Sequence, residues 1–72
     1  MSYDAGRTYK KVEIIGISDK GYEEAIQAGI NRAHKSLDGL SWFEVQEMRG
    51  HVDSAGQVSE YQVVMKVAFE LK

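Results

Sequence analysis

Apolar and polar residues alternate in the segment "TYKKVEIIGI", residues 8–17. Val12 and Ile14 fall on one side of an extended backbone, and Lys11 and Glu13 fall on the other. A period of two combined with β-branched residues is typical of a strand with one buried face. The pattern predicts a first strand over residues 8–17.

The spacing of apolar residues changes to three and four after the break "SDKG". This amphipathic pattern predicts a helix from about Gly21 to Leu37, which Asp38 and Gly39 end. Ser18 or Asp19 is in place to cap its first amides. The apolar stripe expected to face a sheet consists of Tyr22, Ile26, Ile30, Ala33 and Leu37.

Two further strands are expected at residues 42–52 and 58–72, joined by the loop "DSAGQ". The last strand alternates over its whole length and is the most apolar, which places it in the middle of the sheet. A glycine loop between the two favours an antiparallel hairpin. The predicted fold is α+β, with the element order β-α-β-β and a three-stranded antiparallel sheet of order 1-3-2 that has the helix on one face.

Alternation also predicts which side chains the helix leaves uncovered. If Val63 and Met65 pack on the helix, Gln62 points the other way, and if Phe43 points to the helix, Trp42 also points away from it. Beyond residue 45, strict alternation would turn apolar residues outward. We therefore expect a β-bulge near Glu47 that returns Met48 and Val52 to the core and turns Arg49 outward.

The size of the chain makes association with copies of itself the expected outcome. The sequence forms one domain of 72 residues, 1–72, and has no cysteine, so no disulfide can supplement a small core. One helix covers one face of the sheet, which leaves Val64 and Ala68 on the other face. We expect a homo-oligomer with closed symmetry.

Charge and hydropathy narrow the class of partner. Nine basic and eleven acidic residues give a net charge of −2, which argues against a protein that binds nucleic-acid backbones. No apolar segment suggests a signal peptide or a membrane span. The expected protein is cytoplasmic, with no nucleic-acid or membrane partner.

Trp42, Gln62 and Arg49 form the candidate binding chemistry. An indole offers a flat surface on which a fused heteroaromatic can stack. The amide of Gln62 pairs with a ring edge that displays N–H and C=O side by side, and Arg49 can hold a phosphate. The structural alternatives are packing at an interface for Trp42 and a solvated side chain for Gln62.

The other polar residues point to no catalytic motif, so no enzyme and no metal site are predicted. His34 is expected on the solvated side of the helix, and His51 either in a loop or rim position or lining the pocket. Glu44 and Glu47 are expected to be solvated or to form ion pairs between subunits. The alternatives that stay open are a ligand-free structural oligomer, a module for another heteroaromatic and, least favoured by charge, a single-strand nucleic-acid module.

Four stretches together resemble the dodecin family: "YKKVEIIGIS", "EEAIQAGINRAHKSL", "WFEVQEMRGHV" and "EYQVVMKVAFEL". The resemblance runs from about Tyr9 to Leu71. It implies a sheet wrapped partly around one helix, assembly into a hollow homododecamer, and a role in flavin storage, buffering and photoprotection. It also implies pairs of stacked flavins (FMN, with riboflavin or FAD as alternatives) held between tryptophans at subunit contacts.

The resemblance also assigns roles to single residues. It implies that Trp42 stacks on the flavin, that Gln62 bonds the edge of the isoalloxazine and that Arg49 contacts the phosphate of FMN. Some members hold coenzyme A, which would involve Tyr9 and Lys10. Where many bacterial members resemble "GFRL", this chain has "AFEL", so Glu70 replaces a basic residue and bears on the preference for FMN.

Overall fold

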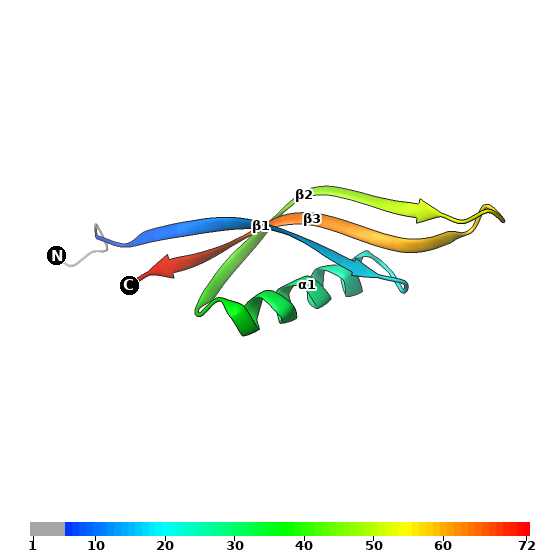
Figure 1. Cartoon of the computed structure of the whole chain (residues 1–72). Helices are drawn as coiled ribbons and strands as arrows, with labels where there is room; N and C mark the ends of the chain where they lie inside the picture. Colours follow the sequence, from blue (N-terminus) through cyan, green and yellow to red (C-terminus); the bar gives the residue numbers. More distant parts are fainter. Residues whose placement is uncertain (1–5) are drawn as a thin grey trace.

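The computed structural model describes residues 6–72, and its element order confirms the predicted β-α-β-β fold (Figure 1). The antiparallel sheet has the order β1-β3-β2, with β3 in the centre. The expected bounds agree with the observed bounds within two residues. The elements are β1 (Thr8–Ser18), α1 (Tyr22–Ser36), β2 (Leu40–Val52) and β3 (Val58–Leu71).

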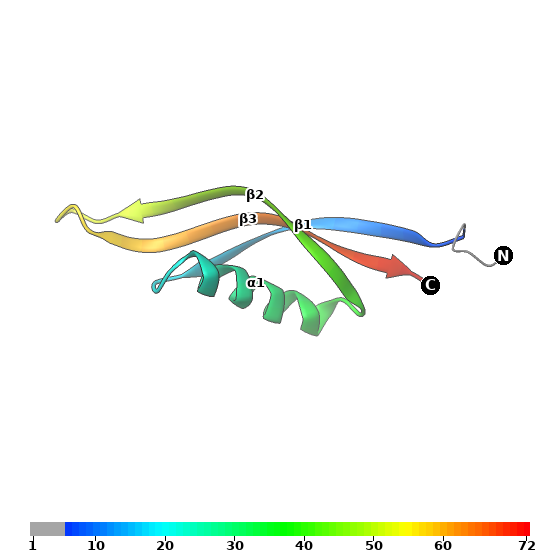
Figure 2. The same ribbon diagram turned by 180° about the vertical axis from the view of Figure 1, so that it is seen from behind.

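The helix α1 lies on one face of the sheet and packs against β1 and β3 (Figures 1 and 2). Two glycines allow this close approach. A Cβ at Gly16 would collide with the carbonyl oxygen of Ala25, and a Cβ at Gly29 would lie 2.5 Å from the terminal methyl of Met65. The centre of the core consists of Ala25, Val63 and Met65. The expectation that Val63 and Met65 face the helix is confirmed.

The buried stripe of α1 is made of smaller residues than the sequence suggested. Ala25, Gly29 and Ala33 are buried, whereas Ile26 and Ile30 are only partly buried at the side of the contact. Small residues lie at the centre because the helix backbone almost touches β1 there. The larger side chains flank this line of contact and fill the space beside it.

The predicted helix cap is wrong. Gly21 is the N-cap residue, and no side-chain hydrogen bond to the first amides of α1 is present among the described residues 6–72. The hydroxyl of Ser18 instead accepts a hydrogen bond from the backbone N–H of Lys20 at 3.0 Å, which stabilises the turn before the helix. Glu23 and Glu24 in the first turn still stabilise the helix, because their negative charges lie near the positive end of the helix dipole.

The predicted bulge in β2 is confirmed, although it does not bury what was expected. The register shifts between Val45, which pairs with Met65, and Glu47, which pairs with Val64. Met48 thereby turns to the helix side but stays 50% exposed, because α1 does not extend over β2. Val52 follows a further irregularity and is 60% exposed, so the expected burial of both residues is wrong for the single chain.

The single chain is elongated. Its principal extents are 60, 21 and 15 Å and its radius of gyration is 15.4 Å, whereas a compact chain of this size would have about 11 Å. The β2–β3 hairpin projects past the end of α1 (Figure 1). Its loop is closed by Asp53, whose Oδ1 accepts hydrogen bonds from the N–H groups of Ala55 and Gln57, both at 2.9 Å.

Candidate functional site

The candidate site residues lie on the outer face, which we define as the sheet face opposite α1. Trp42 pairs with Ala68 and Arg49 pairs with Gln62 across the β2–β3 ladder. All four have the opposite parity to the buried residues of the helix side. The expectation that Trp42 and Gln62 share the uncovered face, together with Arg49, is therefore confirmed.

Four residues at one end of the outer face form the Trp42 cluster: Tyr9, Lys11, Trp42 and Glu44. The indole N–H of Trp42 donates to Glu44 Oε2 at 2.9 Å, and the ring of Tyr9 lies 4.9 Å from the indole, tilted by 50°. Lys11 donates to both carboxylate oxygens of Glu44, at 3.0 and 3.2 Å. The cluster thus connects β1 to β2 across β3.

The pKa of Glu44 is lowered by this environment. The hydrogen bond from Trp42 is the largest cause, followed by the hydrogen bond from Lys11. Partial loss of solvent opposes the shift, and the charges of Lys11 and Lys66 add to it. The carboxylate is consequently ionised at neutral pH and is a stable acceptor for the indole N–H.

The Gln62 cluster occupies the other end of the outer face and contains Glu47, Arg49, Glu60 and Gln62. Arg49 Nε donates to Gln62 Oε1 at 2.7 Å, and the amide nitrogen of Gln62 donates to Glu60 Oε1 at 3.4 Å. Arg49 also pairs with Glu47 at 3.3 Å. These contacts fix the orientation of the Gln62 amide and keep the guanidinium on the same face.

The two clusters are well separated within one chain. Trp42 is level with Ala68 and Arg49 is level with Gln62, six residues apart along β3. At roughly 3.3 Å per residue, the separation along the strand is about 20 Å. One ring system cannot stack on Trp42 and bond Gln62 of the same chain. A site that uses both residues on one ligand needs at least two copies of the chain.

The remaining predicted residues divide between the clusters and other surfaces. Tyr9 contacts Trp42, and the ring of His51 approaches the hydroxyl of Ser59 at 3.5 Å near the Gln62 cluster. Lys10 pairs with Phe69, on the face opposite to Tyr9. His34 is exposed in the last turn of α1, as expected.

Sequence reasoning missed Lys11 and Glu60 as parts of these clusters and did not anticipate the contact between Glu44 and Trp42. Glu44 and Glu47 were expected to be solvated or to pair between subunits, yet both pair within the chain, with Lys11 and Arg49. The spacing of two residues between Trp42 and Glu44 was an available signal, because such residues share a strand face.

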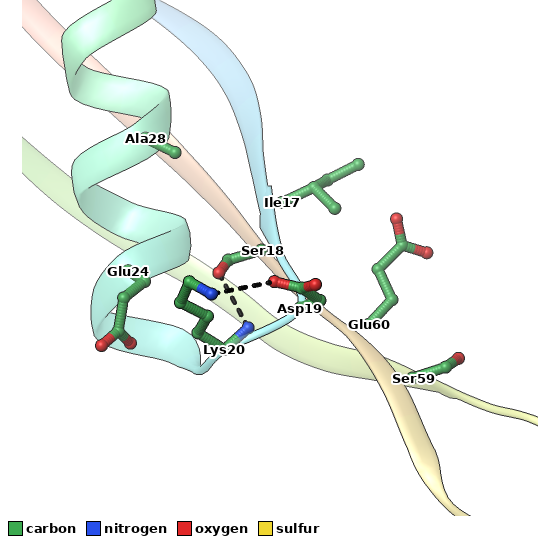
Figure 3. A pocket seen from close by; sticks show the side chains of 8 residues that line it. All are labelled: Ile17, Ser18, Asp19, Lys20, Glu24, Ala28, Ser59 and Glu60. Carbon is green, nitrogen blue, oxygen red and sulfur yellow. Dashed lines mark hydrogen bonds and ion pairs between the residues drawn. The ribbon is translucent and has the colours of Figure 1, made fainter.

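Two hollows border the clusters, one beside Trp42 and the other beside Glu60. An apolar groove of about 440 Å³ runs between Ile26 and Ile30 of α1 and residues 40–43 of β2. An open polar pocket of about 650 Å³ lies beside the turn before α1 (Figure 3). Lys20 there lies 4.0 Å from Asp19 in an exposed ion pair, and the carboxylates of Glu24 and Glu60 point away from each other (Figure 3). Its polar groups do not converge on one point.

Metal-ligating residues do not gather in the part of the chain that the structure describes: no three His, Asp or Glu side chains within residues 6–72 come together in a way that could hold an ion. Within the same range, no helix combines the length and the apolar character that a bilayer span requires.

The fold and the outer face define a small α+β domain that presents an exposed indole and, at the other end of the same face, an oriented amide beside an arginine. The family model for dodecin matches residues 8–72. The chain is 55% identical to the dodecin of Thermus thermophilus over 67 residues, which cover 93% of this chain and 96% of that protein. It is also 34% identical over 64 residues to a protein of Mycobacterium tuberculosis named calcium dodecin, with 89% of each covered.

Solved structures agree with the sequence comparison. The Thermus thermophilus protein superposes with a TM-score of 0.87 over 93% of this chain and 97% of that chain, at 55% identity. Dodecin from Streptomyces davaonensis superposes with a TM-score of 0.89 over 94% and 98%, at 46% identity. The chain belongs to the dodecin family, a family of small binding proteins that form oligomers.

Proposed function

We propose that this protein stores and buffers flavin in the cytoplasm, as a hollow homododecamer that holds stacked pairs of flavins between tryptophans of neighbouring subunits. FMN is the expected flavin, with riboflavin and FAD as alternatives. In this proposal Trp42 stacks on the isoalloxazine, Gln62 bonds its edge and Arg49 contacts the phosphate of FMN. Coenzyme A, bound near Tyr9 and Lys10, is a secondary expectation.

The observation that carries the proposal is the separation of Trp42 from Gln62 on one half-exposed sheet face. Trp42 is 44% exposed and its ring is held by Glu44 and Tyr9, so it is available for stacking. Because Gln62 is about 20 Å along the strand, a ligand that uses both residues must lie between subunits. A flavin site at subunit contacts has this requirement.

The exposed apolar residues support assembly. Phe43, Val45 and Met48 lie on the helix side of β2 beyond the cover of α1, and Ile15 and Ile17 lie on the outer face. All five are more than 40% exposed in the single chain. Apolar surface of this extent is typical of a protein that packs against copies of itself.

A photoprotective role follows from the stacking. An indole in van der Waals contact with a flavin donates an electron to the excited ring, and the return of that electron restores both partners. The excited flavin is thereby quenched before it can react with other molecules. The chemistry consumes nothing, so the protein acts as a store and a shield and not as an enzyme.

The relative named calcium dodecin raises calcium as a second ligand. Within residues 6–72 of a single chain, no group of acidic side chains is arranged to bind a calcium ion. The aromatic and amide groups of the outer face favour a flat heteroaromatic ligand.

The test is a fluorescence titration of FMN and riboflavin with the purified protein, combined with native mass spectrometry. We expect quenched flavin emission and a particle of twelve subunits with flavins bound in pairs. A colourless dodecamer that does not quench added flavin would reduce the function to that of a structural oligomer.

A further inference from the structure

Glu44 contacts both the ring on which the flavin is proposed to stack and the cation that fixes the carboxylate. One oxygen, Oε2, accepts the indole N–H of Trp42 at 2.9 Å, while Lys11 lies 3.0 Å from Oε1 and 3.2 Å from Oε2. Lys11 comes from β1 and Glu44 from β2, so the ion pair crosses β3. The indole is therefore held at its N–H edge through a carboxylate that a second strand positions.

This arrangement fixes the indole before any ligand arrives. Tyr9 packs against the ring with centroids 4.9 Å apart, and Glu44 restrains rotation about the side-chain bonds through the N–H. A ring that is already held loses less freedom when a ligand stacks on it. Glu44 thus bears on the affinity of the site without touching the ligand.

The charge of Glu44 has a second consequence. A carboxylate next to the indole N–H stabilises positive charge on the ring, and this attraction is stronger at a partly desolvated site than in open water. The groups that face the carboxylate are Trp42 on its own strand, Lys11 from β1 and Lys66, its partner on β3. Of these, the indole N–H and the Lys11 ammonium contact the carboxylate directly.

We propose that Glu44 is a positioning residue for the Trp42 indole and that its negative charge promotes electron donation from this indole to an excited flavin. This inference rests on the proposed function. In the step, one electron leaves the indole and enters the half-empty orbital of the excited flavin, which gives an indole radical cation and a flavin radical anion. The electron then returns, and the N–H proton stays in the hydrogen bond to Glu44.

The experiment compares the parent protein with Glu44→Gln and with Glu13→Gln as a matched control. The amide of Glu44→Gln keeps an acceptor for the indole N–H but removes the charge. Glu13 also lies on the outer face, opposite Lys66, and has no contact with Trp42 among those found in residues 6–72. All three proteins are used as assembled particles.

The first measurement needs no flavin. Trp42 is the only tryptophan, so the protein shows a single indole N–H resonance in a ¹H–¹⁵N spectrum. We expect this resonance to shift with a midpoint in the acid range in the parent and in Glu13→Gln, and to stay constant in Glu44→Gln. A parent resonance that does not respond to acid would overturn the positioning role, whether or not flavin binds.

The second measurement is the excited-state lifetime of bound riboflavin, which carries no phosphate. We expect a severalfold longer lifetime in Glu44→Gln at nearly unchanged affinity, and a parent lifetime that lengthens as the pH falls. Equal lifetimes in Glu44→Gln and the parent at every pH would overturn the role of the charge and leave stacking intact. A parent protein that binds neither riboflavin nor FMN would refute the proposed function and with it the electron-donating role, while the indole resonance would still decide the positioning role.

A second variant covers the case in which Glu44→Gln does not assemble. Lys11→Gln removes one of the three groups that lower the pKa of Glu44, which are Trp42, Lys11 and Lys66. Its indole resonance should therefore titrate at a higher pH than that of the parent. An unchanged midpoint would contradict the role of the Lys11–Glu44 pair.

Discussion

Ala68 lies directly opposite Trp42 across the β2–β3 ladder, and it is fully buried although no helix covers that face. Its partner on the other side is Lys11 of β1. The Trp42 cluster crosses β3 at this point, since Lys11 reaches Glu44 and Tyr9 reaches Trp42. A small residue in the central strand leaves room for these contacts.

Ala68→Leu is expected to displace the indole more than it destabilises the fold. The added side chain would meet the groups of the Trp42 cluster, which can move outward, so we expect weaker riboflavin binding and an altered near-ultraviolet circular dichroism of Trp42. A well-packed core would lose about 1–3 kcal/mol from such overpacking, and we expect the loss in unfolding free energy to be at the lower end. Ala28→Leu, on the exposed side of α1, is the control. It should leave the riboflavin affinity and the circular dichroism of Trp42 unchanged. Unaltered riboflavin affinity in Ala68→Leu would refute the argument.

Trp42→Ala is expected to weaken flavin binding and to relieve quenching while the particle still assembles. Stacking of a heteroaromatic on one aromatic side chain contributes roughly 1–3 kcal/mol, which corresponds to about five- to 150-fold in affinity. Gln62→Ala removes edge hydrogen bonds of about 1 kcal/mol and should have a smaller effect. Fluorescence titration with riboflavin measures both. A larger loss for Gln62→Ala would reverse the ranking.

The strands and the helix could be predicted because their apolar spacing is regular, and the bulge because strict alternation would have turned Met48 outward. The burial pattern of α1 could not be predicted from the sequence, because it is set by the close approach of Gly16 in β1 to the backbone at Ala25. The same holds for the two clusters. Which lysine meets Glu44 depends on the register of three strands, and the alternation along one strand does not fix which residues lie opposite each other on its neighbours.

Gly16→Ala is expected to destabilise the fold, because the new methyl group would collide with the carbonyl oxygen of Ala25. Backbone cannot move away as a flexible side chain can, so the loss should reach at least about 1–3 kcal/mol. Gly6→Ala is the matched control, since nothing lies within 4 Å of its added Cβ. Urea unfolding at one fixed protein concentration compares the two, because an oligomer gains stability with concentration. Equal midpoints would mean that α1 shifts to accommodate the methyl group.

Acid should weaken the contribution of Glu44 to stability. Its pKa is lowered in the folded protein, first by the N–H of Trp42 and then by Lys11, so the folded state favours the ionised form. This contribution is fully present above the unfolded pKa and is lost as the pH falls through the folded pKa. Unfolding midpoints of the parent and of Glu44→Gln should therefore converge at acid pH and differ most near neutrality. A difference that is constant with pH would show that ionisation of Glu44 is not involved.

Arg49→Ala is expected to reduce the affinity for FMN more than the affinity for riboflavin, if the guanidinium contacts the phosphate. The structure adds a second effect, because Arg49 Nε holds Gln62 Oε1 at 2.7 Å, and its loss should also weaken riboflavin binding through the freed amide. The double variant Arg49→Ala/Gln62→Ala separates the phosphate contact from the effect on the Gln62 amide. When Gln62 is already alanine, Arg49→Ala should no longer reduce the riboflavin affinity but should still reduce the FMN affinity. Arg32→Ala, on the exposed surface of α1, is the control for general charge.

Glu70→Arg tests the preference for FMN over riboflavin by adding a positive charge instead of removing one. Glu70 pairs with Tyr9 at the end of the sheet that carries the Trp42 cluster, where the resemblance placed a basic residue in many bacterial dodecins. Reversing its charge should strengthen FMN binding relative to riboflavin, and raising the salt concentration should reduce this gain by screening. Parallel titrations with both flavins measure the ratio. An unchanged ratio for both Arg49→Ala and Glu70→Arg would place the phosphate away from this face.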